Sequence, residues 1–222
     1  MKYLDKINNP KDLKNIPVGE LTEVCVELRH YIIDTINQIG GHLAPTLGTI
    51  ELTTAIHYVF DAPKDKIVWD TGHQAYAHKV LTGRFSEFPT IRKYKGLSGF
   101  LKRSESEYDT FGAGHASTSI SAALGMASAR NLNNDDYKVV SIIGDGALSG
   151  GLAFEALNNA GNVRKQLLVV VNDNDMSISP NLGAFRNYLV KIATNKKYNQ
   201  IRKWIYRSIK RFPSKFFVNI LR

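Results

Sequence analysis

The chain has 222 residues, of which 43% are hydrophobic, 10% aromatic and 22% charged. This composition is typical of a globular protein and excludes collagen-like, low-complexity and disordered classes. The single cysteine, Cys25, excludes a disulfide framework and indicates a core thiol in a reducing compartment. Residues 1–20 lack the apolar run of a secretory signal, and no stretch approaches the ~20 apolar residues of a spanning helix. We therefore expect a cytoplasmic protein.

The formal net charge of +9 is concentrated near the end of the sequence. No acidic residue follows Asp175, whereas eleven of the 29 Lys and Arg residues do. The remaining 18 basic and 20 acidic residues give positions 1–175 a net charge of −2. The basic character therefore belongs to a tail, which argues against the chain as a whole being a nucleic-acid-binding protein.

Helical patterns alternate with short apolar runs, which predicts an α/β domain with a mainly parallel sheet and helices on both faces. Helices are predicted over 19–38, with Gly40 and Gly41 as its C-cap, then over 48–60 and from His73 onward. Two more are predicted, one capped by Ser117–Ser119 and running to about Arg130, and one over 151–161. Strands are predicted over 66–70, 138–143 and 167–171, the last two buried on both faces. A long irregular segment, 83–114, separates the first strand from the next helix, and such length is typical of a functional loop.

The end of the chain forms a separate unit in this interpretation. We expect a cofactor-binding domain over 1–194 and a basic amphipathic helix over 195–222, with Tyr198, Ile201 and Ile205 on its apolar side. A surface helix docked through that side is the favoured interpretation. A membrane-surface or RNA-binding segment is the alternative.

A candidate metal and diphosphate site follows the second predicted strand. That strand runs into Gly144-Asp145-Gly146, and the next strand ends at Asn172, so both turns lie at the carboxyl edge of the sheet, where open α/β sheets bind ligands. Asp145, the amide oxygen of Asn174 and a carbonyl near Met176 are oxygen donors of the kind that Mg²⁺ prefers. Glycines at 144 and 146 leave room for phosphates. A simple Gly-Asp-Gly hairpin turn is the alternative.

Three of the six histidines follow a glycine, at positions where exposure to a cleft is expected: His42, His73 and His115. Imidazole exchanges protons near neutral pH, so these side chains are candidates for proton transfer. His30, His57 and His78 are interpreted as structural, and the segment Lys102–Asp109 as a solvated charge run.

Over residues 12–187 the chain resembles the amino-terminal domain of the 1-deoxy-D-xylulose-5-phosphate synthase family, thiamine-diphosphate enzymes related to transketolase. The motifs that carry the resemblance occur in the family's order: Gly41-His42-Leu43-Ala44-Pro45, Trp69-Asp70, Gly72 to Tyr76, Gly96 to Gly99, Lys102 to Asp109, Gly114-His115, Ser117 to Met126, Gly144 to Gly151 and Asn172 to Asn181.

The resemblance implies a set of site residues. It implies Mg²⁺ ligation by Asp145, Asn174 and the Met176 carbonyl, diphosphate contacts from Gly146, Ala147 and Asn174, and cofactor contacts from Gly114, His115 and Ala116. It further implies that His73 lies beside the diphosphate and thiazolium and that His42 takes part in proton transfer, which makes both catalytic candidates.

The resemblance also implies a reaction, the condensation of pyruvate with glyceraldehyde 3-phosphate with loss of CO₂, in isoprenoid and thiamine biosynthesis. The glutamate that protonates the aminopyrimidine belongs in the family to a pyrimidine-binding domain that this sequence lacks. We therefore expect the isolated chain to be inactive, with a separate partner chain supplying that domain or the chain being a truncated or degenerate copy. A homodimer is also expected, and no membrane or nucleic-acid partner. The amino-terminal subunit of a split transketolase and a vestigial, non-catalytic binding module are the alternatives.

Overall fold

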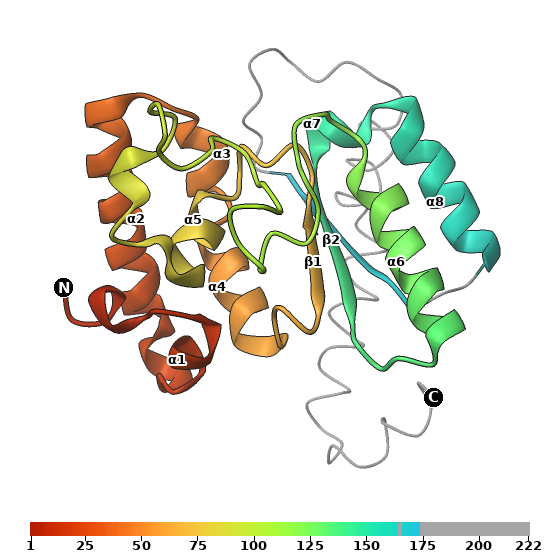
Figure 1. Ribbon diagram of the computed structural model, residues 1–222, viewed down its shortest axis with the longest axis horizontal. Coiled ribbons are helices and arrows are strands. Elements are labelled where there is room, and N and C mark those ends of the chain that lie inside the picture. The colour runs from red at the N-terminus through yellow and green to blue at the C-terminus, as the bar shows by residue number, and fades with distance from the viewer. Residues whose placement is uncertain (164–165, 174–222) are drawn as a thin grey trace, which may run out of the picture. The chain divides into compact units, whose positions relative to one another are not determined.

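The computed structural model describes residues 1–163 and 166–173, which form an α/β domain (Figure 1). Its sheet contains β1 (Lys66–Trp69), β2 (Val139–Gly144) and β3 (Leu168–Asn172) in the order β1-β2-β3. Both strand pairs are parallel, with Trp69 opposite Ile142 and Gly144 opposite Asn172. The three strands therefore end at the same edge of the sheet, and the predicted fold class is confirmed.

The predicted helices are present with small shifts of their ends. The helices are α1 (Pro10–Lys14), α2 (Leu21–Ile39), α3 (Leu43–Leu47), α4 (Ile50–Val59), α5 (Tyr76–Lys79), α6 (Ser119–Asn133), α7 (Asp145–Leu148) and α8 (Gly151–Val163). Gly40 caps α2 as predicted, because its φ of 76° is open to glycine and its N–H bonds the Ile36 carbonyl at 2.8 Å. The helix expected to open at His73 begins at Tyr76 instead, which leaves His73 in the turn after β1.

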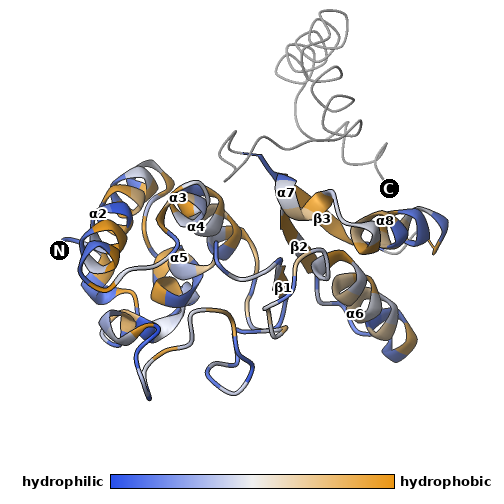
Figure 2. Cartoon of the chain, turned by 90° about the horizontal axis from the view of Figure 1, so that it is seen from above, coloured by the Kyte–Doolittle hydropathy of each residue, from blue (hydrophilic) through white to orange (hydrophobic). Residues whose placement is uncertain are grey.

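Helices cover both faces of the sheet. On one face, Ile67, Trp69 and Ile142 pack with Ile56 of α4. On the other, Val68 and Val139 pack with Ala123 and Ala127 of α6. Alternate residues of β1 thus point to opposite helical layers. Figure 2 shows α2 to α5 on one side of the strands and α6 and α8 on the other, with hydrophobic colour concentrated where these layers meet.

The prediction that β3 is buried on both faces is wrong for the described residues. β2 is buried from Val139 to Ile143, whereas Leu168 and Val171 of β3 are 47% and 43% exposed. Among the residues described, β3 pairs only with β2 and is an edge strand, but so is β1, whose residues Ile67–Trp69 are buried, so edge position alone does not explain the exposure of β3. A continuous apolar run shows that both faces of a strand can be buried, but not which elements cover them.

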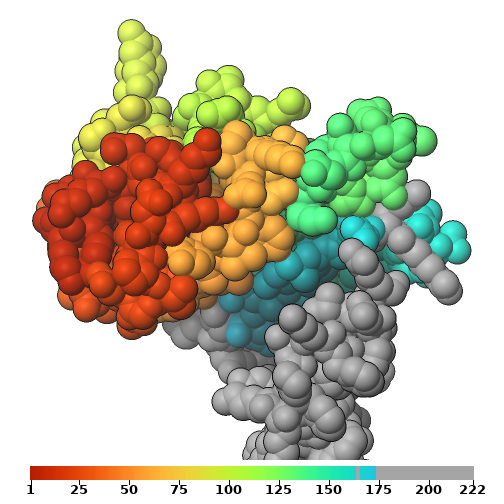
Figure 3. Space-filling model, turned by 90° about the horizontal axis from the view of Figure 1, so that it is seen from below, coloured from red at the N-terminus to blue at the C-terminus, as the bar shows by residue number. Residues whose placement is uncertain are grey.

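The amino-terminal helices form a second core together with the long segment. Leu13, Leu28 and Ile32 pack there with Phe88 and Leu97. Figure 3 shows the yellow surface of residues near 75–100 next to the red surface of the amino-terminal helices. Cys25 is buried in the same cluster, as the sequence predicts. The long segment is therefore packed onto the domain rather than extended into solvent.

The predicted carboxyl-terminal tail and the prediction that no helix spans a membrane stand as follows. The boundary at 194 and the amphipathic helix over 195–222 lie outside the described residues. Within residues 1–163 and 166–173, no helix combines the length and the apolar character needed to cross a bilayer.

Candidate functional site

The candidate site lies where the parallel strands end. β1 is followed by Asp70 and the turn that carries His73, and β2 leads directly into Asp145 at the start of α7. Because Gly144 is in register with Asn172, Asp173 follows β3 at the same edge. This edge is where ligands bind in open parallel sheets, and the strand registers bring its polar residues together as the sequence indicates.

The Asp70 carboxylate joins β1 to the segment before α6. Its two oxygens accept the backbone N–H groups of Ser117 at 2.8 Å and Ser119 at 3.0 Å, and the carboxylate is almost fully buried. The sequence predicted that the Ser117–Ser119 hydroxyls cap this helix, but Thr118 at the N-cap makes no side-chain capping bond. Asp70, directly after β1, instead accepts the amide groups at the start of the helix.

Ser117 extends this connection to the turn after β2. Its Oγ donates a 2.6 Å hydrogen bond to the Ala147 carbonyl in α7. Ser117 has a φ of 72°, and a Cβ on the adjacent Gly150 would overlap its side chain. Gly150 therefore permits the close approach, and the ends of β1, α6 and α7 are fixed relative to one another.

His42 and His73 lie near each other at the site. Their ring centroids are 5.7 Å apart, and the His42 ring also lies 6.3 Å from that of Phe100. His42 is exposed and His73 is half-buried. Burial, reinforced by the neighbouring His42, lowers the pKa of His73, although Asp70 acts in the opposite direction. His73 is therefore neutral at pH 7, a form that can accept or donate a proton through different ring nitrogens.

Backbone contacts hold the two histidine segments in place. Thr46 donates its hydroxyl to the His73 carbonyl at 2.9 Å, and Thr49 donates to the Gln74 carbonyl at 2.8 Å. The His42 N–H reaches the Tyr76 hydroxyl at 3.5 Å. Tyr76 is fully buried and packs in the core. The turn after β1 is thus attached by hydroxyl groups to α3 and to the N-cap of α4.

Gly114, His115 and Ala116 are exposed, on the segment that runs from the long loop into Ser117. The His115 Nδ1 lies 3.1 Å from the Ala116 carbonyl. Gly72 passes so close to this segment that a Cβ on it would lie 2.9 Å from the Ala113 Cβ. The segment is therefore adjacent to the turn that carries His73.

The proposed metal ligands are only partly described. Asp145 is half-buried and Gly146 is exposed beside it, whereas Asn174 and Met176 lie outside the described residues. Within the described residues, no three His, Cys, Asp and Glu side chains gather as a metal site. The predicted set contains a single carboxylate, completed by amide and carbonyl oxygens. Space is open around Gly144, where a Cβ would meet nothing within 4 Å, and the Asp145 carboxylate suits a hard cation.

The interpretation of Lys102–Asp109 as a solvated charge run is wrong for two of its residues. Lys102 and Arg103 are exposed, but the Asp109 side chain is 0% exposed and that of Glu105 only 13%. Their partners, Lys79 and Arg84, come from around α5, so local composition does not reveal them. Polar groups of this kind are buried only when they are paired.

The three remaining histidines lie apart from the site residues. His57 and His78 are fully buried and contact each other, as expected for structural histidines. His30 is exposed on α2.

The sequence alone does not reveal Asp70 and Ser117 as residues that build the site. Their bonds join positions 30 to 49 residues apart. The available signals were an acidic residue directly after a strand and a Ser-Thr-Ser run after Ala116, and neither identifies its partner.

This architecture, with its polar groups at one edge of a parallel sheet, is that of a diphosphate-type domain of transketolase-like thiamine-diphosphate enzymes, in agreement with the family match that follows. The sequence model described as 1-deoxy-D-xylulose-5-phosphate synthase matches residues 4–221, and the chain belongs to this family. The match extends beyond residues 12–187, where the motifs carried the resemblance.

Similar proteins bear the same name. The chain is 59% identical over 210 residues to the 1-deoxy-D-xylulose-5-phosphate synthase of Carboxydothermus hydrogenoformans, which covers 95% of this chain and 34% of that protein. It is 57% identical over 212 residues to that of Thermomicrobium roseum, with 95% and 34% covered. The chain thus spans about a third of the length of these relatives. They do not favour the split-transketolase alternative.

Proposed function

We propose that this chain supplies the magnesium- and diphosphate-binding part of a 1-deoxy-D-xylulose-5-phosphate synthase. The observation that carries the proposal is the connection from Asp70 through Ser117 to the Ala147 carbonyl. It holds the Gly114–Ala116 segment and the Asp145 turn at one edge of the sheet. Family membership supports the same conclusion.

In this proposal, Asp145, Asn174 and the Met176 carbonyl hold Mg²⁺. Gly146, Ala147 and Asn174 contact the diphosphate of thiamine diphosphate, and Gly114, His115 and Ala116 approach it from the long segment. The exposed Gly146 offers backbone that no side chain shields. The single carboxylate of this set leaves coordination positions for neutral oxygens and phosphate.

The two neighbouring histidines would handle protons in the reaction. When bound, thiamine diphosphate supplies a carbanion-stabilising centre for joining pyruvate, with loss of CO₂, to glyceraldehyde 3-phosphate. His73, neutral because of burial, would orient groups beside the thiazolium. His42 is exposed, and its ring centroid lies 5.7 Å from that of His73. It would exchange protons at the reacting centre.

Turnover would require groups beyond these residues. The chain spans about a third of its relatives, and by the family resemblance the glutamate that protonates the aminopyrimidine belongs to a second domain. We propose that this domain, in the same protein or a partner chain, completes the site, with a homodimer as the assembly. The buried single cysteine favours a reducing compartment, the cytoplasm.

Calorimetry separates the enzymatic proposal from a vestigial module. Thiamine diphosphate is titrated into the chain with Mg²⁺ and, in parallel, with EDTA. Metal-dependent heat is expected, with weak affinity because the pyrimidine side is missing. No metal-dependent binding at millimolar ligand would favour the vestigial interpretation. Pyruvate consumption by the purified chain alone would contradict the need for a second domain.

A further inference from the structure

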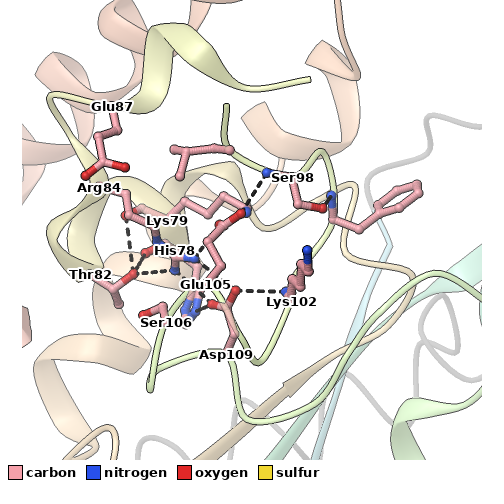
Figure 4. Close-up of polar contacts among 12 residues, drawn as sticks. His78, Lys79, Thr82, Arg84, Glu87, Ser98, Lys102, Glu105, Ser106 and Asp109 are labelled. Carbon is pink, nitrogen blue, oxygen red and sulfur yellow. Dashed lines mark hydrogen bonds and ion pairs between the residues drawn. The ribbon is translucent and has the colours of Figure 1, made fainter. Parts of the chain in front are cut away.

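A buried ionic network holds the segment 98–113 from inside (Figure 4). Both Asp109 oxygens are engaged by the Arg84 guanidinium, at 2.8 and 2.9 Å. The carboxylate also accepts the Lys102 backbone N–H at 3.0 Å and lies 3.2 Å from His78 Nε2. The buried Asp109 side chain thus connects position 109 and the backbone of Lys102 to His78 in α5 and to Arg84 after it.

Glu105 makes a second set of bonds beside the first. It pairs with Lys79 and with Arg84, the latter at 2.9 Å, and accepts the Ser98 backbone N–H at 2.7 Å. Lys79 is fully buried, and burial lowers the pKa of its ammonium although Glu105 acts in the opposite direction. The network therefore joins buried cations to backbone amides at both ends of residues 98–102.

Asp109 also sets the protonation pattern of two buried histidines. Burial would raise the pKa of its carboxyl, but hydrogen bonds from His78 and Arg84 hold that pKa well below its ordinary value. Burial lowers the pKa of His78, so at pH 7 it is neutral and donates its Nε2–H to the Asp109 carboxylate. Its Nδ1 must then accept from His57 Nε2, 2.9 Å away. The hydrogen-bond pattern thus assigns the Nε2–H tautomer to both rings.

The anchored segment reaches the candidate site at two places. The segment closes on itself where the Ala113 N–H donates a hydrogen bond to the Leu101 carbonyl at 3.2 Å. Leu101 lies between Phe100, whose ring is 6.3 Å from that of His42, and Lys102, which Asp109 binds. Ala113 directly precedes Gly114. A shift of this closure would move the neighbour of His42 and the Gly114–Ala116 segment together.

We propose that Asp109 is a positioning residue that, by fixing Lys102 and the Leu101–Ala113 closure, sets the placement of Phe100 beside His42 and of the Gly114–Ala116 segment. This placement follows from the contacts of this chain alone, and its catalytic meaning rests on the function proposed above. Asp109 touches no reacting group and acts only through the segment that it holds.

The test compares three variants of the chain. Asp109→Asn keeps the side chain's shape but removes its charge. Glu107→Gln changes an exposed carboxylate two residues away. Asp65→Asn alters a buried carboxylate before β1 that accepts the Lys138 and Asp61 N–H groups, and it controls for a general loss of stability.

Two measurements need no cofactor. At pH 7, Asp109→Asn is expected to raise the hydrogen-exchange rates of the amides of residues 100–116 at least about tenfold relative to those of β2. Asp65→Asn is expected to leave the exchange rates of residues 100–116 unchanged. In ¹⁵N NMR, the introduced amide can donate to His78 Nε2, so both buried rings should switch to the Nδ1–H tautomer, and the His42 ring signals should shift. Glu107→Gln should match the wild type in both.

Unchanged amide exchange over 100–116 and unshifted His42 signals in Asp109→Asn would overturn the proposal. Faster exchange over 100–116 and shifted His42 signals in Asp65→Asn would overturn it as well. If Asp109→Asn does not fold, Glu105→Gln takes its place. It must then accelerate the amide exchange of residues 98–105 and shift the NMR signals of the His42 ring. Thiamine diphosphate titration of the wild type is a separate arm. Its failure would count against the proposed function and leave the positioning result standing.

Discussion

The Asp70 carboxylate accepts the backbone N–H of Ser117 at 2.8 Å across 47 residues of sequence. Its other oxygen accepts the Ser119 N–H, so one buried side chain fixes both the end of β1 and the start of α6. Ser117 then bonds the Ala147 carbonyl after β2. The relative placement of β1, α6 and α7 at the candidate site therefore depends on a carboxylate that is not itself a predicted ligand.

Replacing Asp70 should destabilise the domain. Asp70→Ala leaves two buried amides unpaired, and we expect a loss of about 2–4 kcal/mol in the free energy of unfolding, with a smaller loss for Asp70→Asn, which keeps one acceptor oxygen. Urea denaturation followed by circular dichroism measures this. Asp136→Asn, which breaks an exposed pair with Lys64, should leave the midpoint unchanged. Equal midpoints for Asp70→Ala and the wild type would remove Asp70 from this role.

A methyl group at position 150 should disturb the same connection. Gly150→Ala places a Cβ into the Ser117 side chain, and we expect a loss of about 1–3 kcal/mol from this overpacking. Adding Ser117→Gly removes the obstructing atoms at a φ of 72°, which suits glycine, so the double variant should recover part of the stability. Thermal melts of the three variants decide the question. A double variant no more stable than Gly150→Ala would show that the Ser117 contact is not the cause.

The backbone at His73 should depend on the Thr46 hydroxyl. Thr46→Val keeps the volume but removes the bond to the His73 carbonyl, and we expect about 1–2 kcal/mol of destabilisation together with shifted His73 ring signals. Thr22→Val, on the exposed side of α2, serves as the control. If both valine variants have unchanged His73 signals, α3 does not hold this turn.

Stability should fall as the pH drops below the ordinary histidine value of 6.5. Burial lowers the pKa of His57, His78 and His73, so below pH 6.5 the unfolded chain binds more protons than the folded one. Protons then favour unfolding, at a cost of up to about 1.4 kcal/mol per pH unit for each buried ring that stays neutral. Urea titrations between pH 7.5 and 5 check this.

Histidine variants identify the groups responsible for this pH dependence. His57→Gln should make the slope shallower, because it removes one of the buried rings, whereas His30→Gln should retain it because His30 is exposed. Constant stability from pH 7.5 to 5 would contradict the assignment of these rings as neutral.

The sequence predicted the helices and strands well, but it did not predict which carboxylates bond to groups on other elements. Periodicity located α2 and α4, and the strand ends brought Asp145 and Asn172 to one edge, because these signals are local. Asp109 was interpreted as solvated because its partner Arg84 lies 25 residues away, and no local pattern marks a charge whose counter-ion comes from another element. The exposure of Val171 was missed for a related reason, since a strand does not encode which elements cover it.

Mn²⁺ titration followed by electron paramagnetic resonance tests most directly whether the turn after β2 binds a divalent cation with thiamine diphosphate, as proposed. With thiamine diphosphate present, the wild-type chain should remove free Mn²⁺ signal, and Asp145→Asn should weaken this binding at least about tenfold. Asp135→Asn, which changes an exposed residue before β2, should bind as the wild type does. Binding by Asp145→Asn equal to wild type, or no thiamine-diphosphate-dependent Mn²⁺ binding at all, would contradict the claim.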